Sequence, residues 1–291
     1  MSDSPLPDLT SQPLDIQHDT DPEPDHGLAR RIPHVGHTLL FFSIVTFSIA
    51  LCLIAALGMV HATSAETVAH HPFAAALGQV AGYVLTFLIA VPLFPSLWTV
   101  TFWQGIHWTP RPARLHWWKL ILLGFALSGL AQLADNFIHS PGDSDVLQLF
   151  STPLSAWVTV VLGTFIPSFV EEVAFRGFLL PSLATAYDWL ALERKPEALQ
   201  RWEQTTNHTL PGWIFAATFS SLAFTALHGF QIHWAKGPLA VLFAVSLVFC
   251  AVRIHYRSVA ASTLVHMAYD FLIFAEMVFA TGGFRHLEKL Q

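Results

Sequence analysis

The residues best suited to chemistry in this sequence are ionisable side chains inside long apolar runs. Glu171 and Glu172 are adjacent, and Arg176 follows them within the run FIPSFVEEVAFRG, which begins at Phe165. At about 100° per residue in a helix, Glu172 and Arg176 share a face and can pair, whereas Glu171 points away. A charge at the centre of a bilayer costs about 2.5–3.5 kcal/mol on insertion scales. The pattern predicts a structural Glu172–Arg176 pair and leaves Glu171 available as a base.

Two later apolar runs carry the other candidate residues. His228 ends the stretch FTALH, and a lone histidine of this kind is more commonly a packing residue than a catalyst. His266 and Asp270 are one helical turn apart, so they can share a water or a metal ion, or Asp270 can orient the imidazole. With the acids near position 171, these residues predict a polar cavity near mid-membrane. A carboxylate beside an imidazole in such a cavity is suited to activating water.

The composition defines the elements that must hold these residues. The chain has 291 residues, of which 53% are hydrophobic and 12% are charged, whereas about 25% charged residues is usual for soluble domains. This balance excludes a nucleic-acid-binding protein, a disulfide-stapled secreted domain, a disordered protein and an ordinary cytosolic enzyme. We expect an all-α, polytopic helical bundle whose partner is the lipid bilayer.

About seven apolar segments are long enough to cross a membrane, and six or eight remain open. With exactly seven spans, the segment after the last span carries two basic residues on the side of the membrane opposite to most other Lys and Arg residues. The predicted segments are roughly 38–60, 73–98, 117–138, 155–180, 212–234, 238–253 and 259–281. The connection 181–211 is the one sizeable loop, and we expect one or two short interfacial helices within 187–203.

The charges divide the chain and suggest its orientation. Residues 1–31 hold seven acids and two bases among several prolines, which predicts a disordered acidic tail over 1–34. Residues 35–154 are then the N-terminal membrane helices, and 155–285 are the catalytic core. With the N-terminus in the cytoplasm, ten Lys and Arg residues lie on that side and three on the other. The sequence therefore predicts a multi-pass membrane protein with a cytoplasmic N-terminus.

The three motifs resemble those of a known family. Glu-Glu-x-x-x-Arg, Phe-x-x-x-His and His-x-x-x-Asn/Asp, on successive membrane helices, are similar to the CAAX-protease and bacteriocin-processing (CPBP, or Abi) family of intramembrane proteases, whose members are type II CAAX prenyl endopeptidase-like. The resemblance covers residues 155–281. It implies an endopeptidase that cleaves near the membrane surface, acting on a CAAX-type peptide, a leader peptide or a membrane-protein segment.

The resemblance also implies a role for each residue. Glu171 would activate water with His228, and His266 and Asp270 would line the same cavity. Glu172 and Arg176 would support the structure of the site. Prenyl-protein proteases typically carry Asn where this chain has Asp270, and an ionised Asp cannot donate a hydrogen bond to an oxyanion.

Metal use and catalytic activity stay open at this stage. His228, His266, Asp270 and Glu171 are ligand types that suit zinc, but the sequence lacks His-Glu-x-x-His, which favours a metal-free glutamate mechanism. A non-catalytic immunity or scaffolding protein of the same fold is the first alternative, and a proton-coupled transporter is the second. The sequence does not indicate the oligomeric state.

Overall fold

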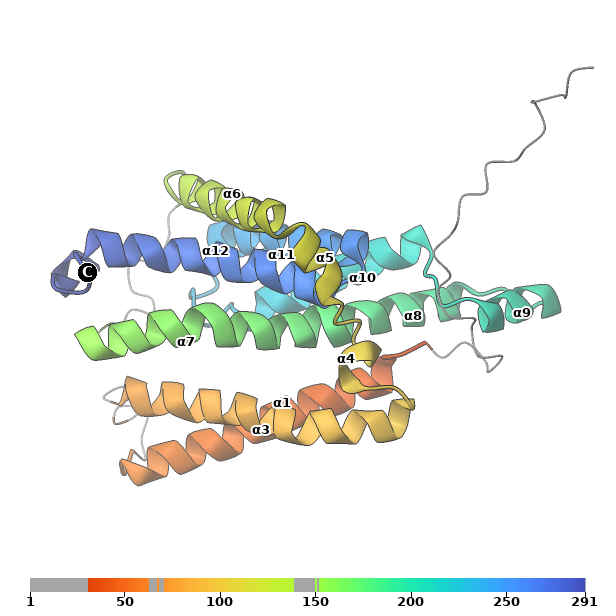
Figure 1. Cartoon of the computed structure of the whole chain (residues 1–291), viewed down its shortest axis with the longest axis horizontal. Coiled ribbons are helices and arrows are strands. Elements are labelled where there is room, and N and C mark those ends of the chain that lie inside the picture. Colours follow the sequence, from red (N-terminus) through yellow and green to blue (C-terminus); the bar gives the residue numbers. More distant parts are fainter. Residues whose placement is uncertain (1–30, 63–66, 68–70, 139–149, 151, 291) are drawn as a thin grey trace, which may run out of the picture.

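The computed structural model describes residues 31–62, 67, 71–138, 150 and 152–290. Most of the predicted acidic tail therefore lies outside the described residues. The part of the chain that is described forms helices and no strand (Figure 1). The α-helices are α1 (Val35–Met59), α3 (Pro72–Trp98), α4 (Phe102–Gly105), α5 (Pro110–Leu115), α6 (Trp117–Asp135), α7 (Pro153–Glu172), α8 (Leu180–Ala191), α9 (Pro196–Gln204), α10 (Leu210–Leu227), α11 (Lys236–Tyr256) and α12 (Val259–Ala280).

Within the described residues, seven helical segments are long and apolar enough to cross a membrane. They are α1, α3, α6, the continuous segment 153–191, α10, α11 and α12. The predicted all-α polytopic bundle of about seven spans is therefore confirmed.

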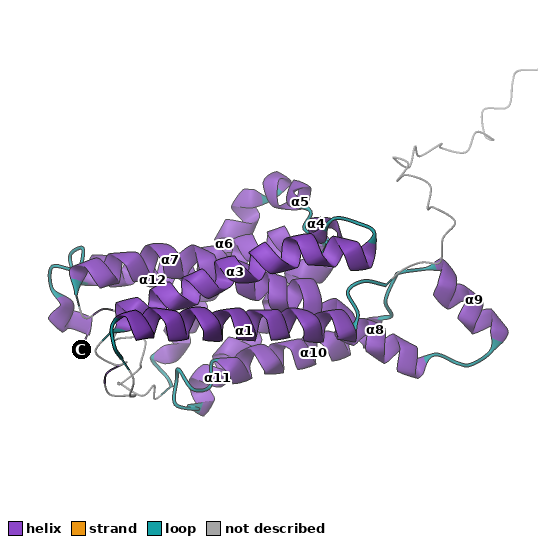
Figure 2. Ribbon diagram, turned by 90° about the horizontal axis from the view of Figure 1, so that it is seen from below, coloured by secondary structure: helices purple, strands orange, loops and turns teal. Residues whose placement is uncertain are grey.

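The fourth span is longer than the sequence indicated. A π-helical segment, η2 (Val173–Leu179), joins α7 to α8, so that helix continues over 39 residues. At about 1.5 Å per residue this is about 58 Å, nearly twice the hydrocarbon thickness of about 30 Å. The prediction that a loop begins at residue 181 is wrong, because residues 181–191 continue the helix. Figure 2 shows α8 and α9 projecting beyond the other helices.

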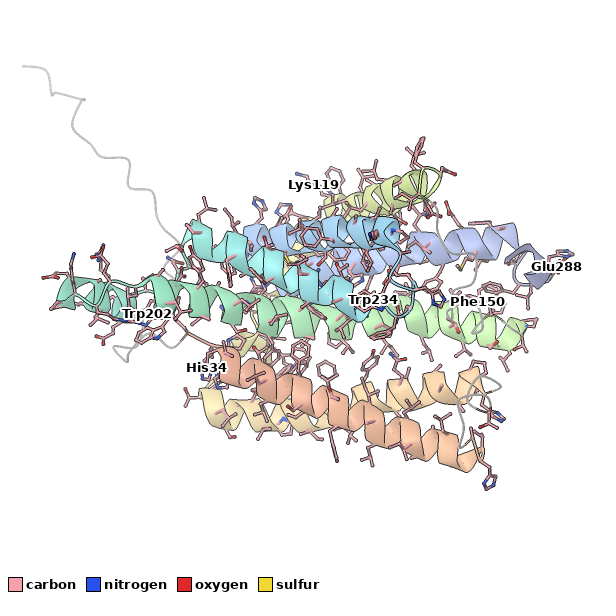
Figure 3. All side chains as sticks on the ribbon, turned by 180° about the vertical axis from the view of Figure 1, so that it is seen from behind. His34, Lys119, Phe150, Trp202, Trp234 and Glu288 are labelled. Carbon is pink, nitrogen blue, oxygen red and sulfur yellow. The ribbon has the colours of Figure 1, made fainter. Side chains whose placement is uncertain are left out.

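The fifth span is shorter than predicted. α10 ends at Leu227, and residues 228–235 form a turn before α11 begins at Lys236. The expected helix over 212–234 is therefore wrong for its last seven residues. Figure 3 shows Trp234, which belongs to this turn, partway along the bundle rather than at its end. The α10–α11 hairpin thus carries His228 to the level of α7 where the two glutamates lie.

Close packing fixes the helices that bear the candidate residues. A Cβ atom at Gly124 of α6 would lie 2.5 Å from the carbonyl oxygen of Val265, so only glycine lets α6 approach α12 this closely. On the other side, Phe41 of α1 stacks on Phe178 of η2 with ring centroids 4.2 Å apart. The π-helical segment is thereby held within a buried aromatic cluster that also includes Phe94 and Trp98.

Candidate active site

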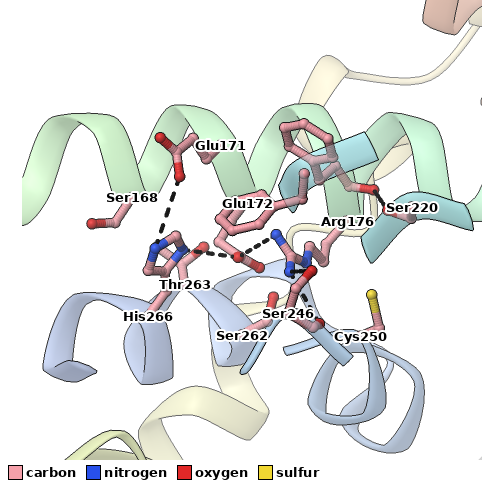
Figure 4. Close-up of polar contacts among 12 residues, drawn as sticks. Ser168, Glu171, Glu172, Arg176, Ser220, Ser246, Cys250, Ser262, Thr263 and His266 are labelled. Carbon is pink, nitrogen blue, oxygen red and sulfur yellow. Dashed lines mark hydrogen bonds and ion pairs between the residues drawn. The ribbon is translucent and has the colours of Figure 1, made fainter. Parts of the chain in front are cut away.

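A fully buried ion pair lies at the junction of α7 and η2. Arg176 Nη1 is 3.1 Å from Glu172 Oε1, and both side chains have no exposed surface. Arg176 Nη2 donates to Ser246 Oγ at 2.8 Å and to the Ser246 carbonyl oxygen at 3.1 Å (Figure 4). The structure thus has the ion pair that the i,i+4 spacing predicted. It also ties η2 to α11, because the guanidinium that pairs with Glu172 donates to Ser246.

His266 extends this buried cluster toward Glu171. Its Nδ1 lies 3.0 Å from Glu172 Oε1, and its ring stacks on Phe249 with centroids 4.5 Å apart. Because a carboxylate only accepts, Nδ1 carries the proton and donates to Glu172. The other nitrogen, Nε2, is 3.8 Å from Glu171 Oε2.

His228 approaches Glu171 from the opposite helix. It caps the C-terminus of α10, where its Nδ1 donates to the carbonyl oxygen of Phe224 at 2.8 Å. Its Nε2 lies 3.9 Å from Glu171 Oε1. Both imidazoles therefore have Nδ1–H bound to a fixed acceptor and direct Nε2 at the same carboxylate.

Glu171 is partly exposed, with 24% of its side chain accessible, and His228 is exposed to a similar extent. Its separations of 3.8 and 3.9 Å from the two imidazoles are too long for direct hydrogen bonds. Gaps of this size suit a bridging water that bonds to both groups. The structure thus brings a half-buried carboxylate and two oriented imidazoles around one small volume.

Asp270 completes the group from the side of α12. Its Oδ2 lies 3.5 Å from His266 Nε2, as the one-turn spacing predicted. It accepts a hydrogen bond from Ser168 Oγ at 2.6 Å. Asp270 is therefore held as an acceptor, which agrees with an orienting role better than with donation to an oxyanion.

Sequence reasoning missed the two serines of this site. Ser168 lies one turn before Glu172 on α7, so its place on the same helical face was a usable signal. Ser246 lies in an apolar run of α11, and nothing in the local pattern pairs it with Arg176. Long-range partners of this kind follow only from the tertiary arrangement.

The residues do not fit a metal ion as they stand. Within the described ranges, no three His, Cys, Asp or Glu side chains converge in a way that could hold one. We therefore derive no chemical step through a metal.

An apolar groove of about 500 Å³ adjoins the site on the α3 side. It is lined by Tyr83, Phe87 and Val91 of α3 and by Phe169 and Val170 of α7, among others. Val170 directly precedes Glu171, so the groove leads to the backbone that carries the carboxylate. An apolar segment arriving from the lipid phase would find matching surface here.

These features define a polytopic helical membrane protein with a carboxylate–imidazole site enclosed by α7, α10 and α12. Residues 153–272 match the family described as Rce1-like, type II CAAX prenyl endopeptidase Rce1-like. The match covers 120 of the 291 residues, and it supports the resemblance to CAAX-protease-like proteins that the three motifs carry. No curated protein and no solved structure matches the chain significantly.

Proposed function

We propose that this protein is an intramembrane endopeptidase that hydrolyses a peptide bond with water activated by Glu171 and His228. The observation that carries the proposal is the placement of Glu171 between the Nε2 atoms of His228 and His266, at 3.9 and 3.8 Å. A water in this position can bond to Glu171 Oε1 and His228 Nε2 together. The family match supports a peptidase, and the residue roles are the part that we propose.

The reaction follows from the positions of the protons. Glu171 accepts a proton from the water as the water oxygen bonds to the substrate carbonyl carbon. The protonated Glu171 then returns this proton to the leaving nitrogen as the C–N bond breaks. His266 can donate from Nε2 to the developing oxyanion when that nitrogen is protonated, because Glu172 supports the positive imidazolium through Nδ1. Asp270 keeps the imidazole oriented.

The substrate that we propose is a peptide or membrane-protein segment with an apolar part. The groove between α3 and α7 offers apolar surface next to Glu171. The partly exposed carboxylate offers the polar end of the same path. This arrangement suits a bond that lies close to a hydrophobic segment or a lipid-bearing residue.

The test compares Glu171→Gln and His228→Gln with Glu276→Gln, which changes an exposed carboxylate on α12 outside the site. Purified full-length proteins in lipid nanodiscs are incubated with a peptide library, and the products are read by mass spectrometry. We expect the first two variants to lose about 10²–10⁴-fold of the cleavage rate, as is typical when a general base is removed. Glu276→Gln should cleave like the wild type.

Cleavage at wild-type rates by Glu171→Gln would overturn the proposal. Absence of wild-type cleavage, with a cellular phenotype that survives in both site variants, would favour a non-catalytic scaffold. A chelation arm tests the metal question separately. Activity that persists with strong chelators supports the metal-free mechanism, and activity that is lost and then restored by zinc overturns it.

A further inference from the structure

A second polar cavity lies at the end of the bundle where α3 and α11 end and α10 begins. It has a volume of about 580 Å³ and is lined by residues from five separate segments of the chain. Three of these are arginines, namely Arg31, Arg253 and Arg257, and no Asp or Glu belongs to the described lining. The cavity is separate from the site around Glu171, since it shares no lining residue with it.

Arg253 is the central feature of this cavity. Only 4% of the residue is exposed, and no hydrogen-bond partner of its Nε atom lies within the described ranges. It lies seven residues beyond Ser246 on α11, so it is about 10 Å farther along the helix than the Arg176 contact. A buried guanidinium with an unpaired Nε is costly, and an anion in the cavity would stabilise it.

The other two arginines also keep free donor capacity. Arg31 packs its guanidinium over the Trp202 ring at 3.3 Å and donates from Nη2 to the carbonyl oxygens of Trp202 and Thr205. In the described part of the chain, its Nε and Nη1 have no hydrogen-bond partner. Arg257 is exposed, and among the described residues it donates to a neutral amide oxygen, Asn207 Oδ1, at 3.5 Å. Asp188 interacts electrostatically with Arg31, and its carboxylate is also bonded to His208 Nδ1 at 2.9 Å and to Thr209.

His107 lines the cavity beside the arginines. Its ring forms part of the cavity wall and is otherwise buried by the protein. This enclosure, followed by the charges of Arg253, His208 and Arg257, lowers the pKa of His107 to about 4. His107 is therefore neutral at pH 7, and the positive charge of the cavity comes from the three guanidinium groups.

We propose that this cavity binds a phosphate group, supplied either as free phosphate or as the phosphomonoester headgroup of a lipid. A phosphate monoester carries about −1.5 to −2 charges at pH 7 and three acceptor oxygens, so it matches three guanidiniums better than a single carboxylate does. Arginine forks bind such oxygens in bidentate geometry. The place of the cavity at one end of the membrane helices makes both sources accessible. The proposal does not depend on peptidase activity.

The experiment measures thermal unfolding of the full-length protein in phosphate-free buffer at constant ionic strength. Inorganic phosphate is added to the wild type, Arg253→Gln, Arg257→Gln and the control Arg194→Gln, which alters an exposed arginine of the α8–α9 loop outside the cavity. In parallel, nanodiscs of phosphatidylcholine are compared with nanodiscs that also contain phosphatidic acid.

We expect saturable stabilisation of the wild type and Arg194→Gln. The required phosphate or phosphatidic acid concentration should rise at least tenfold for Arg253→Gln and several-fold for Arg257→Gln. A response to phosphatidic acid alone identifies a lipid headgroup, and a response to inorganic phosphate identifies the free ion. No saturable response to either probe overturns the proposal. Equal responses in all four proteins overturn it as well.

A second readout keeps the proposal testable if Arg253→Gln does not fold. Bound phosphate should raise the pKa of His107 by placing negative charge beside it. This shift is followed by NMR through the imidazole signal that is missing from His107→Gln, and Arg257→Gln should weaken it. A pKa of His107 that does not move at saturating phosphate would contradict binding at this cavity.

Discussion

Two neighbouring glutamates occupy opposite environments in this protein. Glu172 has no exposed surface and contacts both Arg176 and His266 within hydrogen-bond or ion-pair distance. Glu171 is partly exposed and approaches the imidazoles of His228 and His266 only at 3.9 and 3.8 Å. The two residues have the same chemistry and differ by about 100° around one helix.

The two environments suit the two glutamates to different roles, structural support for Glu172 and chemistry for Glu171. Glu172 is stabilised as an anion by Arg176 and His266, and its complete burial keeps it away from a substrate. A partly exposed carboxylate beside two oriented imidazoles can exchange a proton. The same helix therefore fixes the site with one glutamate and offers the other for chemistry.

The largest expected effect comes from Glu172→Gln. It leaves the Arg176 charge buried without its carboxylate, and breaking a buried pair in this way costs about 3–5 kcal/mol. Glu171→Gln should change the free energy of unfolding by less than about 1 kcal/mol, since most substitutions away from buried networks have small effects. Reversible unfolding in bicelles measures both values. Equal losses of stability in the two variants would contradict the assignment of the structural role to Glu172 alone.

A smaller effect should distinguish the two histidines. His266→Gln removes a hydrogen bond to the Glu172 carboxylate, and bonds to charged groups contribute about 1.5–3 kcal/mol. His228→Gln removes a bond to a main-chain carbonyl, worth about 0.5–1.5 kcal/mol. Both variants should lose most cleavage activity. If His228→Gln proves the more destabilising of the two, then His228 is part of the structural support.

The smallest effect is expected for Asp270→Asn. The amide oxygen can still accept from Ser168, so the free energy of unfolding should change by less than about 1 kcal/mol. Cleavage should remain within about tenfold of the wild type if the residue only orients His266, since a lost orienting contact is a modest fraction of ΔG‡. Asp270→Leu serves as the comparison and should lose more. A complete loss of activity in Asp270→Asn would show that the negative charge itself is required.

The parts of this site that could be predicted from the sequence are local along the chain. The Glu172–Arg176 pair and the His266–Asp270 contact both depend on the i,i+4 spacing of one helix. The seven spans depend on hydropathy over about 20 residues, which is also a local property. The positions of the spans and of these two pairs could therefore be predicted without knowing how the helices pack.

The parts that could not be predicted depend on where helices end and cross. His228 was expected inside a span, but it caps α10, because the hairpin turns before the predicted end of that span. Neither the π-helical turns after Glu172 nor the Arg176–Ser246 contact has a local pattern. The basic cavity was hidden for the same reason. Its arginines were interpreted one by one as topology markers, and only the fold brings them together.

The depth of the site sets the length of chain that must reach it. His266 is seven residues beyond Val259, the first residue of α12, so the site lies about 10 Å from that end of the bundle. An extended peptide covers this distance with about three residues, at about 3.3 Å each. A helical segment would need about seven, at about 1.5 Å each. For a peptide entering from this end, the number of residues between the scissile bond and the bundle end therefore measures how far the substrate must unwind.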